Sequence, residues 1–519
     1  MPSVNLVGET EGALRLLRNL VARELDLATD DVPVALDYLS MGFSSRGLIG
    51  LIQQLSRLLR TKLSPSLLFD YRTLADFAAY LAEHHAEQLA ALAMEQASSD
   101  VQEERPAPRA QAALSEAQRG LWALQKAWPR MAAYNVPLCL RLSSRVQRAR
   151  MLEACAWLLR RWPMLGASVQ RADGRLVMQA QPGHDLVLEE HHAADWSEAQ
   201  RLRWLRERVE QPFDLDAGPL LRAYWLGGGE GSESRLLLVI HHLVIDAVSV
   251  GILLAGLRKA YEDLEAGRSL DGPVDHAGYG AFAAAEAERL ADIDSAACLS
   301  YWRTALSDAP TSLELPLDHP RGATPGFAGR TLRHELPAAL GEAVQAWSAR
   351  HGVYPSTLLL AVYQGLLSRH SGRDDVVVGM ALDERDASCA GLVGMFVNML
   401  PVRAQGLGQR SFVEEVQALQ RQVVDAMAHS YPFAALVREL GLSGGEAAPL
   451  FQAAYLYQDT LDTQALAGVA DWTWEESLYQ EGEYELVLEV RRRAQGYGLY
   501  LKYDPTLWDE ATLARWLGH

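Results

Sequence analysis

Two short segments of the sequence carry side chains at spacings that could do chemistry. His241 and His242 end an apolar run, and Asp246 follows shortly after them. Ser45 stands in a polar turn just before another periodic apolar segment. Histidine is the side chain best suited to move protons near neutral pH. A serine at a helix N-terminus meets unpaired N–H groups and the positive end of the helix dipole, which together favour a phosphate.

The residue types alone leave a structural role open at both places. Because adjacent strand residues point to opposite faces, His241 can face the core while His242 faces a cleft. From the spacing alone, a core role and a catalytic role are equally expected for His242. From its position alone, Ser45 is more often a simple N-cap than a phosphate site. A metal site would need further ligands. The other pair, His191 and His192, lies in an acidic loop, and there is no HExxH motif, so no metal is expected.

Hydrophobic periodicity predicts the elements that position these residues. Residues from about 10 to 84 predict a small three-helix bundle, with one helix beginning near Ser45 and the last capped by Thr73. The polar stretch from Glu83 to Ala113 predicts a linker, whose first part could continue the last helix. Gly227–Ser234 predicts a surface hairpin loop.

Beyond Leu114, strands and helices alternate without a simple repeat. This length exceeds one comfortable core, so two lobes divided near Glu286–Ser295 are expected. Strands are expected at 138–142, 236–241, 376–380, 453–457, 486–490 and 497–502. Helices are expected at 146–161, 197–209, 249–265, 337–351, 355–368 and 411–428.

Composition excludes several classes of protein. The 519 residues include 48 Lys and Arg against 66 Asp and Glu, a net charge of −18. That balance argues against a nucleic-acid binder, which needs a basic face. The start lacks a signal-peptide pattern, and His241 interrupts the most apolar window, Leu236–Leu254, so no membrane span is expected. Four scattered cysteines fit a reducing cytoplasm without disulfides or zinc: Cys139, Cys155, Cys298 and Cys389.

The first helical unit resembles an acyl or peptidyl carrier domain. The resemblance rests on Asp37–Ser45 (DYLSMGFSS) and Leu63–Ala75 (LSPSLLFDYRTLA). It implies that Ser45 bears 4′-phosphopantetheine, whose thiol holds an acyl chain as a thioester, after action of a phosphopantetheinyl transferase. Because the segment lacks Gly-Gly-x-Ser, it looks closer to a polyketide-type acyl carrier.

Three carrier positions depart from the family pattern and bear on which partners dock. Ser44 stands in place of Asp, Arg46 in place of Leu and Arg72 in place of Pro. Phe43 and Arg46 are the expected docking residues. Residues 1–85 hold 8 Lys and Arg and 10 Asp and Glu, a balance of −2, so docking is expected to depend on local contacts and not on bulk charge.

From Leu114 to the end, the chain resembles the condensation domain of nonribosomal peptide synthetases, in the chloramphenicol-acetyltransferase-like superfamily. The motifs occur in the family's order: Leu114–Trp122, Ala133–Pro137, His241–Asp246, Leu299–Trp302, Leu315–Arg321, Val393–Arg403, Tyr431–Phe433 and Pro449–Gln452. The resemblance implies that His242 is catalytic and His241 mainly structural. It also implies that Asp246 is structural and pairs with Arg222.

Two residues near this motif depart from the family, and one hydroxyl lies close. Ala247 stands in place of Gly, and Gly166 replaces the usual Arg of another motif. Ser249 is the nearest hydroxyl and is expected to cap a helix, so no covalent acyl-enzyme is expected. His242 could take the amine proton, or position the amine and stabilise the oxyanion.

The two resemblances imply an all-α carrier bundle followed by an α/β condensation domain of two lobes arranged as a V-shaped pseudodimer. The expected divisions are a carrier at 1–84, a linker at 85–112, an N-terminal lobe at 113–290 and a C-terminal lobe at 291–519. The chain is expected to be a piece of a larger hybrid polyketide and peptide synthase for an antibiotic-like natural product, with upstream modules as partners.

The implied reaction joins a donor acyl group on Ser45 to an acceptor amine on a downstream aminoacyl carrier, forming an amide. Three alternatives stay open. The acceptor could be a hydroxyl or a free amine, giving an ester or a released chain. The domain could be an epimerisation domain, which shares the His-His-x-x-x-Asp motif. It could also be a non-catalytic gate that binds acyl carriers, in view of Ala247 and Gly166.

Overall fold

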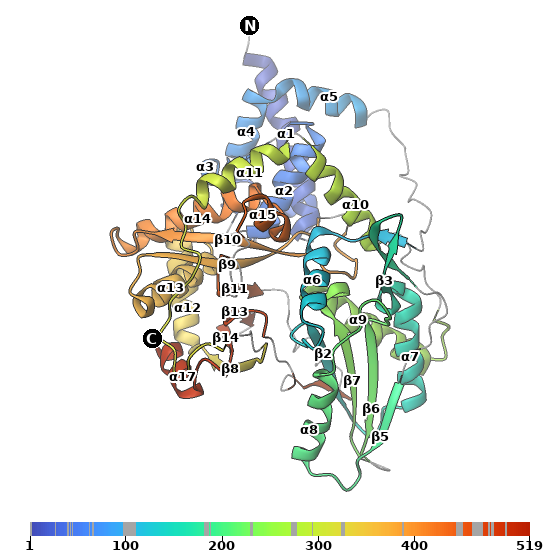
Figure 1. The fold of residues 1–519 in the computed structure, drawn as a ribbon. Helices are drawn as coiled ribbons and strands as arrows, with labels where there is room; N and C mark the ends of the chain where they lie inside the picture. Colours follow the sequence, from blue (N-terminus) through green and yellow to red (C-terminus); the bar gives the residue numbers. More distant parts are fainter. Residues whose placement is uncertain are drawn as a thin grey trace. The chain divides into compact units, whose positions relative to one another are not determined.

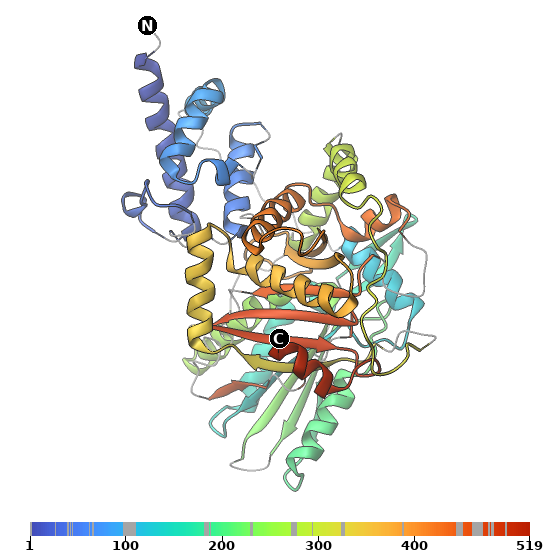
Figure 2. The ribbon, with the colours of Figure 1, turned by 90° about the vertical axis from the view of Figure 1, so that its left-hand side faces the viewer.

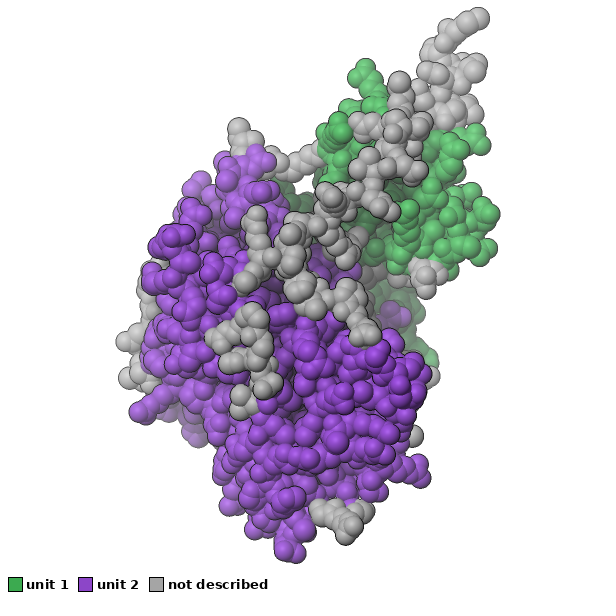
Figure 3. Space-filling model, turned by 90° about the vertical axis from the view of Figure 1, so that its right-hand side faces the viewer, with its two compact units in different colours: residues 1–104, 339–375, 404–430 green, residues 105–338, 376–403, 431–519 purple. Residues whose placement is uncertain are grey.

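The fold is described from a computed structural model (Figures 1 and 2). It describes residues 3–519 with short gaps. The gaps are residues 26, 39–40, 42, 44, 62, 65–66, 97–110, 181–185, 187, 229–231, 271–277, 293, 323–326, 387–388, 443–449, 459–470, 476–477, 479–481 and 494–495. The described residues form two compact units (Figure 3). The first unit combines residues 1–104, 339–375 and 404–430, and the second holds the remainder.

The N-terminal part of the first unit is a helical bundle. Its elements are α1 (Ser3–Leu25), η1 (Thr29–Asp31), α2 (Ser45–Leu58), α3 (Leu67–Asp70), α4 (Leu74–His84) and α5 (Ala86–Gln96). Thr73 caps α4 by accepting the N–H of Asp76 at 3.1 Å, which confirms the predicted cap. Leu17, Phe77 and Leu81 are fully buried where α1 packs on α4.

Three helices from much later in the sequence complete the first unit. They are α12 (Ala338–His351), α13 (Pro355–Ser371) and α14 (Phe412–Ala428). Pro355 opens α13, and Gly372 ends it with a positive φ of 69°, as proline and glycine commonly do at these places. Helix α13 packs on α14, and α14 contacts α2 of the bundle.

The second unit begins with a five-stranded sheet in the order β12-β2-β7-β6-β5. Its strands are β2 (Asn135–Leu142), β5 (Leu188–His192), β6 (Leu221–Gly227), β7 (Ser234–His241) and β12 (Trp472–Trp474). The sheet is antiparallel except where β5 runs parallel to β6. A separate antiparallel sheet is formed by β1 (Gln111–Ala113), β4 (Arg175–Gln179) and β3 (Ser168–Ala172).

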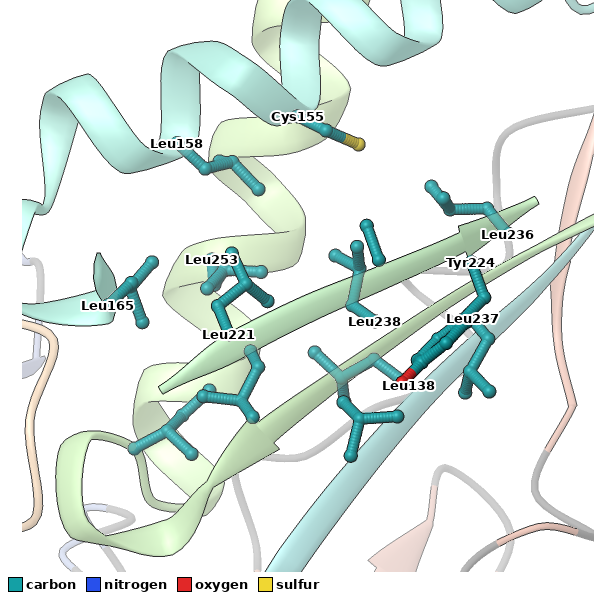
Figure 4. Packing of buried hydrophobic residues seen from close by; sticks show 14 of the residues in the cluster. Leu138, Cys155, Leu158, Leu165, Leu221, Tyr224, Leu236, Leu237, Leu238 and Leu253 are labelled. Atoms are coloured by element: carbon teal, nitrogen blue, oxygen red, sulfur yellow. The ribbon is translucent and has the colours of Figure 1, made fainter. Parts of the chain in front are cut away.

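Two helices cover one face of the five-stranded sheet. These are α7 (Arg148–Arg161) and α9 (Ala247–Glu265), which also pack on each other. Figure 4 shows Cys155 and Leu158 of α7 and Leu253 of α9 turned toward Leu236 and Leu238 of β7. Nearly all residues of β7 are buried, so the close-packed core holds this strand, and with it the start of the next segment, in a fixed position.

Strand β12 joins the five-stranded sheet from the C-terminal part of the sequence. Trp472 pairs with Leu142 of β2, and its ring meets Tyr261 of α9 edge to face at 5.5 Å. Beyond the strand, Glu475 accepts a hydrogen bond from Arg235 Nε at 2.6 Å. The buried guanidinium of Arg235 also pairs with Glu198. A charged network therefore fastens the crossing segment.

The other large sheet of the second unit has six strands in the order β10-β9-β11-β13-β14-β8. They are β8 (Arg330–Glu335), β9 (Asp375–Asp383), β10 (Val397–Gln405), β11 (Ala453–Gln458), β13 (Leu486–Arg493) and β14 (Gly496–Tyr503). Helix α17 (Glu510–Gly518), at the C-terminus, contacts β8 (Figure 2).

The remaining described elements connect these layers. They are α6 (Glu116–Ala127), η2 (Pro163–Gly166), α8 (Glu198–Val209), η3 (His242–Val244), α10 (Gly278–Ala291), α11 (Asp294–Ala305) and α15 (Phe433–Glu439). Helix α6 packs on α15 within the second unit, where Gly120 faces Ala434 too closely for a Cβ.

All six predicted strands and all six predicted helices beyond Leu114 are confirmed, with shifts of a few residues at their ends. Part of the predicted linker is ordered. Residues 86–96 form helix α5 after a break at His85, and residues 111–113 form β1, while 97–110 lie outside the described residues. The hairpin between β6 and β7 is confirmed, apart from residues 229–231, which the structure does not describe. The boundaries of the domains stay predictions.

Candidate active site

Strand β7 carries the two histidines to one end of the five-stranded sheet. The strand ends at His241, and the chain turns at once into η3, whose first residue is His242. The N–H of His241 donates to the carbonyl of Leu220 at 2.9 Å, and that of His242 donates to the carbonyl of Tyr134 at 2.8 Å. Main-chain hydrogen bonds to two neighbouring segments thus fix both histidines.

His241 is a core residue, which confirms its expected burial. It has no exposed surface, and its ring meets Phe213 edge to face at 5.7 Å. Its Nδ1 accepts the N–H of Leu243 at 3.1 Å. Burial lowers the pKa of His241 to about 3, with smaller contributions from His242 and Arg222. A neutral imidazole with that hydrogen bond shapes the turn after β7.

His242 is partly exposed, unlike the four residues that follow it. Its ring lies edge to face with Tyr134, with 6.3 Å between the ring centres. The Nδ1 atom is buried. Nε2 is therefore the ring nitrogen of His242 that can contact a substrate.

The side chain of Gln118 ties the histidine turn to the start of α6. Its Nε2 donates to the carbonyl of Leu243 at 2.8 Å. Its Oε1 accepts the N–H of Ser115 at 3.2 Å, and the Ser115 hydroxyl accepts the N–H of Gln118 in return, which makes a capping box. Gln118 lies inside the first condensation motif, but the sequence alone assigned it no role. The Ser-x-x-Gln spacing is itself the signal of a capped helix.

The expected pairing of Asp246 with Arg222 is wrong, because Asp246 pairs with Arg385. Arg385 Nη1 donates to Asp246 Oδ2 at 2.7 Å, and Nη2 donates to Oδ1 at 2.8 Å. Neither side chain has exposed surface. The bidentate geometry is the strongest form of an arginine–carboxylate pair. Sequence reasoning missed Arg385 altogether.

Two main-chain N–H groups complete the coordination of Asp246. Oδ1 accepts the N–H of Ser249 at 2.8 Å, which makes Asp246 the N-cap of α9. Oδ2 accepts the N–H of Phe396 at 2.9 Å. The Arg385 guanidinium lies 4.0 Å from the centre of the Phe396 ring. The carboxylate thus joins the segment after the histidines to the segment between β9 and β10.

Arg222 is occupied elsewhere. Its Nη2 donates to the carbonyl of Gln211 at 2.8 Å, and its guanidinium lies 3.7 Å from the centre of the Phe213 ring. Phe213 also contacts His241, so Arg222 lies beside the first histidine, on strand β6. The physical reason for the correction is that both oxygens of Asp246 are bound by Arg385 and by main-chain N–H groups, while Arg222 is held by Gln211 and Phe213.

Ser249 does not cap α9, so that expectation is also wrong. Its buried hydroxyl donates to the carbonyl of Gly394 at 2.9 Å and accepts from the Gly394 N–H at 2.9 Å. It also accepts from Arg385 Nη2 at 2.6 Å. A hydroxyl held in this way is a structural bridge. Gly394 has no room for a side chain, because a Cβ would lie 2.2 Å from Tyr279 Cδ2.

The two departures from the family pattern lie in different surroundings. Ala247 is the first residue of α9 and is partly exposed, as His242 is. Gly166 ends η2 and is buried. The effect of either residue on activity stays open.

The candidate attachment site lies in the first unit. Ser45 is the first residue of α2, as the sequence predicts, and Arg46 follows it in the first turn. Ser44 lies outside the described residues. Phe43 is 4% exposed and meets Tyr38 edge to face at 5.9 Å. Phe43 therefore belongs to the buried cluster of the carrier, and its docking role stays a prediction.

The described part of the chain offers neither a metal cluster nor a membrane span. No group of three or more His, Cys, Asp and Glu side chains among its residues is arranged to hold a metal ion. The His191 ring lies tilted against Trp196, with 4.5 Å between ring centres. None of the described helices combines the length and the apolar character that crossing a membrane requires.

Comparisons with known proteins agree on the class. A family model described as the condensation domain matches residues 109–519, and one described as the phosphopantetheine attachment site matches residues 15–81. Polyketide synthase PksN of Bacillus subtilis is 32% identical over 409 residues, which cover 77% of this chain and 7% of that protein. A linear gramicidin synthase of Brevibacillus parabrevis is 30% identical over 508 residues, which cover 95% of this chain and 6% of that protein.

Solved structures share the fold. The condensation domain of the monacolin K polyketide synthase MokA has a TM-score of 0.67 at 21% identity and covers 80% of this chain and 96% of its own. A holo four-domain nonribosomal peptide synthetase, bound to AMP and glycine, has a TM-score of 0.70 at 20% identity. That match covers 81% of this chain and 33% of the synthetase.

The two family models place the chain in the class of proteins that combine a phosphopantetheine attachment domain with a condensation domain. More closely, it belongs to the condensation domain family and carries a phosphopantetheine attachment domain before that domain. The expected fold class, a helical carrier followed by an α/β condensation domain, is confirmed. The chain spans less than a tenth of the length of the two curated relatives described.

Proposed function

We propose that the protein joins a donor acyl thioester to an acceptor amine and forms an amide, with His242 at the reacting atoms. The donor is a polyketide-like acyl group on the carrier at Ser45, and the acceptor is an aminoacyl group on a downstream carrier. The observation that carries the proposal is the placement of His242. It is partly exposed and starts a turn that a buried network holds from several sides.

Ser45 suits a phosphopantetheine attachment because it opens α2, a helix of 14 residues. The free N–H groups of a helix start and its dipole favour the phosphodiester of such an arm. When bound, the arm supplies the acyl group as a thioester, which is already activated toward amines.

His242 can handle the proton that the reaction must move. As the amine nitrogen bonds to the acyl carbon and the carbon–sulfur bond breaks, the nitrogen loses one proton and the sulfur leaves as a thiol after gaining one. Nε2 of His242 is suited to accept the first and to return the second, or to hold the amine in line while it attacks. The buried Nδ1 leaves only one nitrogen for this work.

No covalent intermediate on the protein is needed. Ser249, the hydroxyl nearest in sequence, is buried and shared between Gly394 and Arg385. It cannot also serve as a nucleophile with a paired base. The direct transfer from thioester to amine is therefore the route that these residues support.

The assembly-line context supports the choice of partners. One relative is named a polyketide synthase and another a gramicidin synthase, which favours a chain at a polyketide–peptide junction. We propose an upstream synthase module, a downstream acceptor carrier and a phosphopantetheinyl transferase as partners, and antibiotic-like natural products as the output. None of the four cysteines, all of which the structure describes, forms a disulfide, which favours the reducing cytoplasm as the compartment.

The test uses the full chain after phosphopantetheinyl transfer and acyl loading, with intact-protein mass spectrometry as the readout. Ser45→Ala is expected to gain no arm. His242→Ala is expected to load normally but to form no product with an aminoacyl carrier. His192→Ala, which removes an exposed histidine of β5, is the matched control and is expected to keep activity.

The same assay separates the other candidate functions. Product with a hydroxyl or free-amine acceptor, but not with aminoacyl carriers, would replace the amide proposal by ester formation or chain release. Inversion of the loaded residue without transfer would indicate epimerisation. Carrier binding without turnover by the unaltered chain would indicate a gate, for which the partly exposed Ala247 gives a structural reason. Full activity of His242→Ala would remove His242 from the mechanism.

A further inference from the structure

The turn between α12 and α13 lies in the same compact unit as the carrier bundle. It runs from His351 to Tyr354, and Pro355 begins α13. This turn comes from the condensation region of the sequence, far beyond the carrier, which ends near residue 84. A contact here therefore joins two parts that sequence separation alone would not bring together.

Tyr354 belongs to the hydrophobic cluster of the carrier. It is 4% exposed, and it is grouped with carrier residues such as Tyr38 and Phe43, which are buried to a similar degree. Burial raises the pKa of the Tyr354 hydroxyl, and Asp37 and Tyr38 of the carrier raise it further. A large aromatic side chain buried at such a junction is the usual form of a binding anchor.

The carrier side of this contact holds Arg72, one of its departures from the family pattern. Arg72 is exposed, and its guanidinium lies against Gly352, where a Cβ would stand 3.4 Å from Nη1. Gly352 has a φ of +65°, which favours glycine. The usual proline at position 72 would offer no group that reaches this glycine. The exposed charge of Arg72 and the buried ring of Tyr354 thus resemble the polar rim and apolar core of a protein interface.

The turn itself is held rigidly. The N–H of Tyr354 donates to Oε1 of the buried Gln420 on α14 at 3.0 Å, and Nε2 of Gln417 donates to the carbonyl of His351 at 3.3 Å. Helix α14 also contacts α2, the helix that Ser45 opens. The surface that meets the carrier is therefore preorganised by two glutamines of one helix.

We propose that the turn His351–Tyr354, together with α14, is a docking surface for this chain's own carrier, with Tyr354 as its anchor and Arg72 as the carrier residue at its rim. The surface would hold the donor carrier on the condensation domain between successive transfers of a donor acyl group. It would favour this carrier over carriers with proline at position 72. The proposal concerns docking, and it does not depend on which acceptor the enzyme uses.

A photo-crosslinking residue at position 72 tests the contact in the full chain. Replacing Arg72 by benzoylphenylalanine is expected to give, on irradiation, a cross-link that peptide mass spectrometry maps to residues 351–354. The same probe in place of Arg15, an exposed residue of α1, is the control and is expected to leave that peptide unmodified. Retained phosphopantetheinylation of the probe variant shows that the carrier is folded.

The anchor is tested by adding Tyr354→Ser to the Arg72 probe variant. Serine is a good N-cap, so the start of α13 should persist while the aromatic ring is lost. Loss of an anchor residue is expected to lower the cross-link yield roughly tenfold. Val362→Ser, which removes an exposed apolar side chain of α13 outside the proposed surface, is the control and is expected to leave the yield unchanged.

The results separate this proposal from the proposed function. A cross-link mapped elsewhere, or a yield unaffected by Tyr354→Ser, would overturn the docking surface while leaving condensation untouched. Conversely, His242→Ala could abolish product without changing the cross-link, because irradiation needs neither an acyl group nor an acceptor.

Discussion

Arg385 and Asp246 form a bidentate pair, with distances of 2.7 and 2.8 Å, across 139 residues of sequence. Both side chains are fully buried. The pair links the segment that follows the histidines to the segment that follows β9. The position of the candidate catalytic turn is therefore set by a residue far from it in the sequence.

Removing Arg385 should destabilise this region strongly. Arg385→Ala leaves the Asp246 carboxylate buried without its cation, and such losses cost about 3–5 kcal/mol. The expected result is a clear fall in the midpoint of thermal unfolding. Arg222→Ala, at an arginine that pairs with Gln211 instead, should lower the midpoint much less. An equal fall of the unfolding midpoint in both variants would contradict the special role of Arg385 and favour the pairing of Asp246 with Arg222.

Much of the framework around the site could be predicted from local patterns. The apolar run before His241 predicts β7, and the periodic segment after Asp246 predicts α9, because hydrophobic spacing reports local structure directly. His241 is buried and His242 partly exposed as predicted, but the cause is the turn of the chain into η3 after a strand that is buried on both faces. Residues that are close in sequence are sufficient to predict these features.

The partners of these residues could not be predicted in the same way. Arg385 is one of several charged residues after β9, and nothing local distinguishes an arginine that meets Asp246 from one that meets water. Strand β12 has three residues, too few for a periodic signal. Helix α6 could have been found, because Ser115 and Gln118 carry the spacing of a capping box.

Gln118 is expected to position His242 through the next residue of the turn. Gln118→Glu keeps an oxygen for the cap but loses the amide donor to the Leu243 carbonyl. A shift of the turn should lower kcat roughly 10- to 100-fold, with little change in KM for the acceptor. Single-turnover kinetics with a loaded carrier measure both values.

A matched control for Gln118→Glu exists within the chain. Ser197 and Gln200 form another capping box at the start of α8, where the Gln200 side chain bonds to Ser197. Gln200→Glu should leave kcat within about twofold, because exposed caps affect local stability by only small amounts. An equal loss in both variants would show that the cap, and not the bond to Leu243, matters.

Gly394→Ala should disturb the site by adding one methyl group. A Cβ there would lie 2.2 Å from Tyr279, whose hydroxyl donates to the carbonyl of Met395 at 2.6 Å. Overpacking of this kind costs about 1–3 kcal/mol. The measurement is the unfolding midpoint, together with turnover. Gly391→Ala, where a Cβ meets nothing within 4 Å, is the control, and a similar loss there would argue against the clash.

The stability of the second unit should depend on pH through Glu286. Its Oε2 accepts the N–H of Glu116 at 2.7 Å, at the start of α6. Burial raises the pKa of Glu286 from 4.5 to about 7. The Glu384 and Glu116 carboxylates add to that rise, and the hydrogen bond from the Glu116 N–H and the charge of Arg289 oppose it. Between these two pH values, the folded protein holds a proton that the unfolded chain has lost. The free energy of unfolding contributed by this group therefore falls as pH rises from 4.5 to 7, and the full penalty is present above pH 7.

Glu286→Gln removes that penalty, because the amide stays neutral and its oxygen can still accept the Glu116 N–H. The difference in unfolding midpoint between Glu286→Gln and the parent should therefore grow in favour of the variant between pH 5 and pH 8, a range that spans the pKa of about 7. Glu288→Gln, at an exposed position of the same helix, controls for the loss of one charge. A midpoint difference that is constant over this range would show that Glu286 is ionised in the folded protein throughout. The hydrogen bond from the Glu116 N–H would then lower the pKa of Glu286 more than burial raises it.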